Sequence, residues 1–178
     1  MKNKNNTKWI ITIIIMAFSI SLAFSFMSEL LLKDAGLLLG IVLVLIFILL
    51  GMIFDMIGVA VTSADEKPII SMNAKKIKGS KTAVKLIKNS DKAASLCNDV
   101  VGDICGIVSG TAGVAVAASI SLKFEIDLFI VSLLVTSTIA ALTIGSKAMG
   151  KSIAIKNSTK IITAFSKMLS IFETKKNK

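Results

Sequence analysis

Long apolar runs separated by lysine-rich polar segments set the pattern of this 178-residue chain. Four of the runs are long enough to cross a bilayer as helices, which takes about 20 residues. We expect these spans at residues 9–27, 36–62, 100–122 and 128–145. Residues 1–8 form a basic tail ahead of the first span. That span is longer than the apolar core of a signal peptide, about 7–15 residues, so we expect it to remain uncleaved.

The polar segment between the second and third spans, residues 63–99, has the pattern of an amphipathic helical hairpin. Four lysines recur there at helical spacing, with small apolar residues opposite them, as in helices that lie in a membrane interface. These are Lys81, Lys85, Lys88 and Lys92. Residues 151–178 form a juxtamembrane segment with a similar pattern from 152 to 172. We expect the glycines at 145 and 150 to loosen the helix between this segment and the fourth span.

The chain is therefore expected to be an all-α integral membrane protein. It has about four transmembrane helices, an amphipathic cytosolic hairpin and a C-terminal juxtamembrane amphipathic helix; residues 9–150 form the transmembrane domain. Every lysine except Lys33 and Lys123 lies in the N-terminal tail, in residues 63–99 or beyond residue 145. Because lysines collect on the cytoplasmic side, we predict a multi-pass protein of a bacterial-type plasma membrane with both termini cytoplasmic.

Composition narrows the classes of partner. The chain is 54% hydrophobic, carries a net charge of +10, and contains one Trp and no Tyr. Few side chains could stack on bases, so we expect the lysines to face anionic lipid headgroups and not nucleic acid. The chain has no His and only two Cys, which argues against zinc, copper and hydrolytic catalysis. We therefore expect no enzyme and no organic cofactor, and a hard, oxygen-bound cation such as Mg²⁺ if any metal binds.

Acids at the ends of the apolar runs are candidate ligands for such a cation, because acids in lipid are costly unless paired or functional. Asp55 lies in the second span, where it faces either the bundle interior or the headgroups. Asp99 and Asp103 share one helix face with Asn98 at the start of the third span. These three form a hard-cation ligand set, although charged residues just outside a span are also common. Lys147 is the candidate counter-charge for Asp99 or Asp103 when no metal is bound.

Small residues mark one face of the third span. Gly102, Gly106, Gly110 and Gly113 recur at helical spacing. Rows of small residues let a second helix approach closely in a membrane. We therefore expect a homodimer formed through this face.

Residues 58–154 resemble the transmembrane domain of the CorB/CorC and cyclin M (CNNM) magnesium transporter family. The stretch SADEKP at residues 63–68 is similar to the family's motif at the end of its first span. KNSDK at residues 88–92 resembles the turn that ends the family's cytosolic hairpin. NDVVGD at residues 98–103 corresponds to the polar start of the next span, and SKAMGK at residues 146–151 to the exit motif of the last.

The resemblance implies that Ser63, Glu66 and Asn98 join the ion site. It departs at Lys147, which takes the place of the family's glutamate and would repel a divalent cation unless it points away. Family members also continue into nucleotide-sensing CBS domains, whereas the chain ends after the juxtamembrane helix. The metal-site candidates are thus Asp55, Ser63, Glu66, Asn98, Asp99 and Asp103.

Two functions follow as hypotheses. The first is a divalent-cation transporter or ion-binding membrane module for Mg²⁺ or a similar ion. The alternative is a non-transporting membrane scaffold or regulatory subunit that keeps the transporter fold. The lysine at position 147 points to the second, in which the ion site has been lost.

Overall fold

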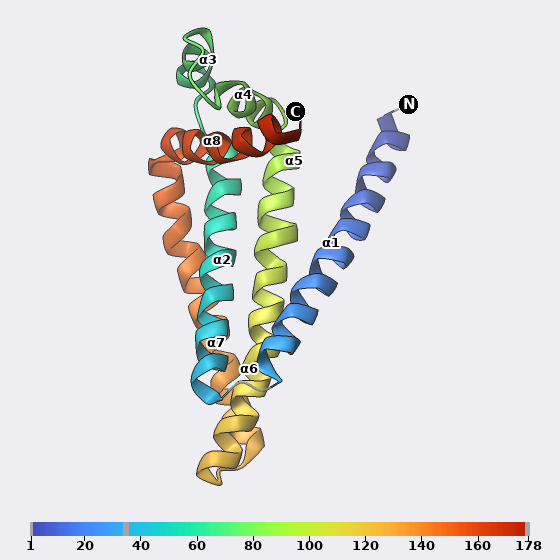
Figure 1. The fold of residues 1–178 in the computed structure, drawn as a ribbon, viewed down its shortest axis with the longest axis vertical. Coiled ribbons are helices and arrows are strands. Elements are labelled where there is room, and N and C mark those ends of the chain that lie inside the picture. The colour runs from blue at the N-terminus through green and yellow to red at the C-terminus, as the bar shows by residue number, and fades with distance from the viewer. Residues whose placement is uncertain (1, 34–35, 177–178) are drawn as a thin grey trace. The chain divides into compact units, whose positions relative to one another are not determined.

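The computed structural model describes residues 2–33 and 36–176, and all regular structure within those ranges is helical (Figure 1). The long helices are α1 (Lys2–Leu32), α2 (Leu37–Ser63), α6 (Asp103–Phe124) and α7 (Leu128–Lys156). The short ones are α3 (Glu66–Ala74), α4 (Ser80–Lys88), α5 (Ser90–Ser95) and a π-helix, η1 (Leu96–Gly102); α8 (Ser158–Lys176) ends the described chain. The predicted all-α class is confirmed.

Within the described residues, four helical segments are long and apolar enough to cross a membrane. They cover Thr7–Leu32, Leu37–Ser63, Ser90–Phe124 and Leu128–Lys156. Helices suit this role because every backbone hydrogen bond is made within the segment, where lipid offers no partners. The number of these segments agrees with the prediction of about four spans, and their length and composition suit them to cross a membrane.

Residues 1–52 and 99–147 form one compact unit, here unit 1. Its core lies between α2, α6 and α7 and contains Val44, Ile48, Ala112, Val116 and Ile139. Helix α1 packs against α6 near the end of α1, while much of its remaining surface is apolar and exposed (Figure 1). In a bilayer this exposed surface would face lipid, which is compatible with a spanning helix.

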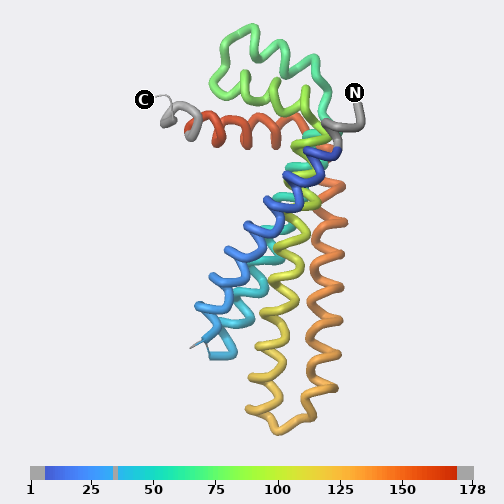
Figure 2. Tube along the Cα trace, turned by 90° about the vertical axis from the view of Figure 1, so that its right-hand side faces the viewer, coloured from blue at the N-terminus to red at the C-terminus, as the bar shows by residue number. Residues whose placement is uncertain are grey.

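Residues 53–98 and 148–178 form the second compact unit, unit 2. Helix α4 lies between α3 and α8 in this unit (Figure 2). Its apolar residues Ala83 and Ile87 are buried in a core that also includes Ile69 of α3 and Ile162 of α8. Its lysines, Lys81, Lys85 and Lys88, are exposed. The apolar face of α4 is therefore covered by protein.

Two helices extend beyond their predicted ends. Helix α1 continues to Leu32, past residue 27, where we expected the first span to end. Helix α7 passes through Gly145 and Gly150 and ends at Lys156, and α8 then begins at Ser158. The expectation that these glycines loosen the helix was wrong. A glycine costs about 1 kcal/mol in a helix, which the favourable terms of a long helix readily exceed.

Candidate functional site

A lysine and an aspartate from distant parts of the sequence meet in unit 1. Asp103 is the first residue of α6, and Lys147 lies in α7. The Lys147 ammonium donates a hydrogen bond to Asp103 Oδ1 at 2.8 Å. The Lys147 side chain is 23% exposed and that of Asp103 is 63% exposed, so the ammonium is the more enclosed partner. The predicted role of Lys147 as a counter-charge is confirmed for Asp103.

The pair neutralises the acid at the start of α6. A charge-assisted hydrogen bond of this length is stronger than one between neutral groups. The ammonium contacts one carboxylate oxygen. It therefore places a positive charge at a position where a bound cation would need an oxygen ligand. A divalent cation that bound Asp103 through this oxygen would have to displace Lys147, at a cost set by their attraction.

The segment just before α6 is wound as the π-helix η1, which holds Asn98 and Asp99. Such wider turns are rare and often occur at functional sites. In unit 2, Asn98 packs against α2 at Gly58, where a Cβ would overlap the Asn98 side-chain amide. Asn98 Oδ1 is buried and accepts no hydrogen bond from any residue that the structure describes. Asp99, the next residue, is exposed.

The remaining site candidates lie in unit 2 at the end of α2 and the start of α3. Asp55 is half-buried in α2, Ser63 is the exposed last residue of that helix, and Glu66 is the exposed first residue of α3. Between them, Asp65 caps α3 by accepting a hydrogen bond from the Lys67 backbone N–H at 3.1 Å. Part of the SADEKP motif therefore has a local structural role.

No group of three or more His, Cys, Asp or Glu side chains able to hold a metal ion occurs within residues 2–33 and 36–176. Of the six predicted ligands, Asp103 has an ammonium partner, and Asn98 Oδ1 has no hydrogen-bond partner among the described residues. In unit 1 the described ion pair joins one oxygen of Asp103 to the Lys147 ammonium. A Mg²⁺ site would require several more oxygen ligands around Asp103.

The glycine row of α6 packs within the chain over part of its length. In unit 1, a Cβ at Gly113 would overlap the Ile139 side chain of α7, and one at Gly106 would lie 3.7 Å from Thr143 Cγ2. A Cβ at Gly110 would meet nothing within 4 Å. The row therefore supports close approach of α7, and the homodimer stays a prediction.

Two features escaped the sequence reasoning. The π-helix has no simple sequence signal, because its residues also fit an α-helix. The other is Glu29, which lies beyond the predicted end of the first span and which the structure places in α1 beside a cavity. Its signal was available: Ser25, Glu29 and Lys33 recur at i, i+4 and i+8, which puts them on one helix face.

Comparison of the chain with protein-family models, with curated proteins and with solved structures finds no match. The resemblance to the CorB/CorC and cyclin M family therefore rests on the short motifs of the sequence.

Proposed function

We propose that this protein is a non-transporting membrane scaffold or regulatory subunit in which an internal ammonium takes the place of a bound cation. The observation that carries the proposal is the 2.8 Å ion pair between Lys147 and Asp103. A site that binds Mg²⁺ needs uncompensated oxygen ligands, and here the acid already has its counter-charge. Under the family resemblance, the position of Lys147 is that of an acid, so this single change converts a ligand into a competitor.

The membrane topology of the chain is part of the same proposal. The exposed lysines of α4 would face anionic headgroups on the cytoplasmic side of a bacterial-type plasma membrane, with both termini on that side. A second copy of the chain is the partner we propose, packed along the part of α6 near Gly110 that is open in the monomer.

Binding or transport of a divalent cation is the second candidate. Asn98 Oδ1 is a buried acceptor with no partner in the described chain, and an unmatched buried acceptor calls for an explanation such as an ion or a water. Its neighbour in η1, Asp99, supplies a carboxylate. For this function, the cation must displace the Lys147 ammonium from the Asp103 carboxylate.

Thermal unfolding of the purified full chain with and without millimolar Mg²⁺ separates the two functions. A ligand that binds only the folded state stabilises it by RT ln(1 + [L]/Kd), about 2.7 kcal/mol at a hundredfold excess over Kd. We expect no Mg²⁺-dependent shift for the natural chain. We expect a shift for Lys147→Glu, which removes the ammonium and restores an acid. Lys151→Glu, the same charge change one turn away in α7, is the matched control and should not respond.

A Mg²⁺ shift in the natural chain that disappears in Asp103→Asn would overturn the scaffold proposal in favour of cation binding. If Lys147→Glu and Lys151→Glu respond equally, the shift reflects net charge and the specific role of Lys147 is rejected.

A further inference from the structure

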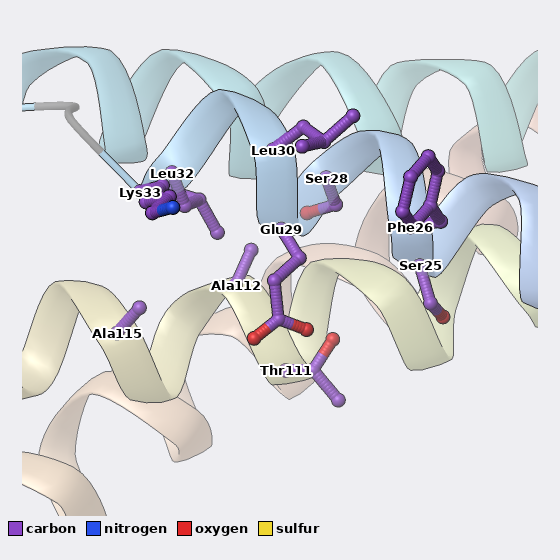
Figure 3. Close-up of a pocket in the computed structure, with 10 residues that line it drawn as sticks. All are labelled: Ser25, Phe26, Ser28, Glu29, Leu30, Leu32, Lys33, Thr111, Ala112 and Ala115. Carbon is purple, nitrogen blue, oxygen red and sulfur yellow. The ribbon is translucent and has the colours of Figure 1, made fainter.

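A cavity of about 630 Å³ lies in unit 1 between the end of α1 and the middle of α6 (Figure 3). Its volume is in the range of small-molecule sites, about 300–1,000 Å³. Polar lining comes from Ser25, Glu29 and Lys33 on the α1 side and from Thr111 on α6. Phe26 and Leu30 add apolar surface. The cavity thus joins a few polar groups to an apolar wall, and none of its lining residues belongs to the Asp103 site.

The carboxylate of Glu29 points from α1 toward α6, the helix that carries Thr111 (Figure 3). Within the described chain, neither Glu29 nor Lys33 has an ion-pair partner. An acid near the end of an apolar helix is costly in a membrane unless something compensates its charge. The Glu29 carboxylate therefore lines the cavity without a counter-charge from any described residue.

Positive and negative groups are separated along the same wall. Glu29 and Lys33 are four residues apart, so their Cβ atoms lie about 5–6 Å apart on one helix face. Lys33 closes the end of α1, where its backbone N–H donates to the Glu29 carbonyl at 3.0 Å. In Figure 3 the Lys33 side chain lies at one end of the lining and Ser25 at the other. This order matches a zwitterionic ligand whose charges are a few ångströms apart.

The acceptors around Glu29 favour a primary ammonium over a quaternary one. Thr111 donates its hydroxyl hydrogen to the Val108 carbonyl at 3.0 Å, so its oxygen is left to accept. Together with the two oxygens of the Glu29 carboxylate, it gives the cavity acceptors for the N–H groups of an ammonium. A quaternary ammonium has no N–H and could satisfy none of them.

The apolar wall indicates which class of molecule carries this ammonium group. Phe26 is 64% exposed and Leu30 57% exposed, on a helix that is apolar enough to span a bilayer. We propose that the cavity binds a zwitterionic glycerophospholipid with a primary amine, of the phosphatidylethanolamine type. Its ammonium contacts Glu29, its phosphate contacts Lys33, and an acyl chain lies along Phe26 and Leu30.

Lipid selectivity of the natural chain provides the first test and needs no variant. Dioleoyl phosphatidylethanolamine and dioleoyl phosphatidylcholine share both acyl chains and the phosphate, and differ only in N-methylation. We expect the purified chain in detergent to retain the first lipid at least about tenfold more tightly by native mass spectrometry, the effect of losing one hydrogen bond to a charged group. Equal retention of the two lipids overturns the proposal.

The variant Glu29→Gln then tests whether the charge of Glu29 causes this selectivity. It keeps the shape of the side chain and removes its charge, so the preference for phosphatidylethanolamine should fall by about tenfold or more. Glu125→Gln removes an exposed acid at the far end of α6 and should leave the preference unchanged. Selectivity that persists in Glu29→Gln rejects the assignment. Neither result depends on whether Lys147 competes with a cation.

Discussion

Two glycines of α6, three residues apart, have opposite surroundings. A Cβ at Gly113 would overlap the end of the Ile139 side chain in α7, whereas a Cβ at Gly110 would meet nothing within 4 Å. Gly113 and Ile139 both belong to unit 1, and Ile139 is part of its core. The small size of residue 113 is therefore required for packing, and the sequence row alone does not distinguish it from residue 110.

Gly113→Ala should lower the stability of the folded chain by about 1–3 kcal/mol, the usual cost of inserting a methyl group into a packed core. Thermal unfolding in detergent measures this loss. Gly145→Ala, in α7, is the matched control and should cost nothing, because a Cβ there meets nothing within 4 Å and alanine favours the helix. Shortening the neighbour in Gly113→Ala/Ile139→Val should recover part of the loss. A Gly113→Ala chain as stable as Gly145→Ala would show that α6 and α7 do not pack as described.

At the scale of elements, α4 is held against α8 by a left-handed glycine. Gly79 precedes α4 with φ of 87°. A Cβ there would lie 2.8 Å from Cα and 2.9 Å from the backbone nitrogen of Lys167 in α8. Backbone atoms cannot rotate away as a side chain can. The turn before α4 thus depends on glycine for its conformation and for its approach to α8.

Gly79→Ala should destabilise the packing of α4 on α8. The left-handed conformation alone costs a residue with a Cβ about 1–2 kcal/mol, and the contact with Lys167 adds to it. Hydrogen exchange of the α4 and α8 amides should accelerate while exchange in α6 stays unchanged. Lys76→Gly, in the same turn, is the control: Lys76 has φ of 54°, so glycine relieves strain there. Equal protection in Gly79→Ala and the natural chain would contradict this account of the turn.

Helices α7 and α4 are stabilised by different contributions. Helix α7 runs unbroken through two glycines because local propensity is a small cost beside the hydrogen bonds of a 29-residue helix. Helix α4 has only nine residues and would be marginal alone in water. Its stability comes from burying Ala83 and Ile87 in the core of unit 2. Helix α7 is stabilised by its length, and helix α4 is stabilised by tertiary packing.

At the scale of the whole molecule, orientation in the membrane is the property still to be measured. Single cysteines replacing Lys81 and Lys123 can report it in a Cys97→Ala/Cys105→Ala background, since both lysines are exposed. An impermeant maleimide added to intact cells should label position 123 and not position 81, because lysine-rich segments remain cytoplasmic. Position 81 should react only after the membrane is opened. Labelling of position 81 from outside would overturn the topology.

The sequence by itself determined the number and helical nature of the apolar segments. Runs of about 20 apolar residues have few structural options in lipid, where backbone groups must bond within the segment. The acids and Lys147 as a candidate counter-charge could also be identified, because charged residues near apolar runs are rare and stand out. These signals are local in the chain.

Only the tertiary structure decided which residues meet. The partner of Asp103 is 44 residues away, and that pairing depends on how α6 and α7 are aligned side by side. The same holds for Asn98 against Gly58, Gly113 against Ile139 and the cavity that Glu29 lines. Each depends on the rotation and depth of one helix against another. Periodicity gives the face of a helix but not its neighbour, because many alignments bury similar apolar area and only side-chain fit separates them.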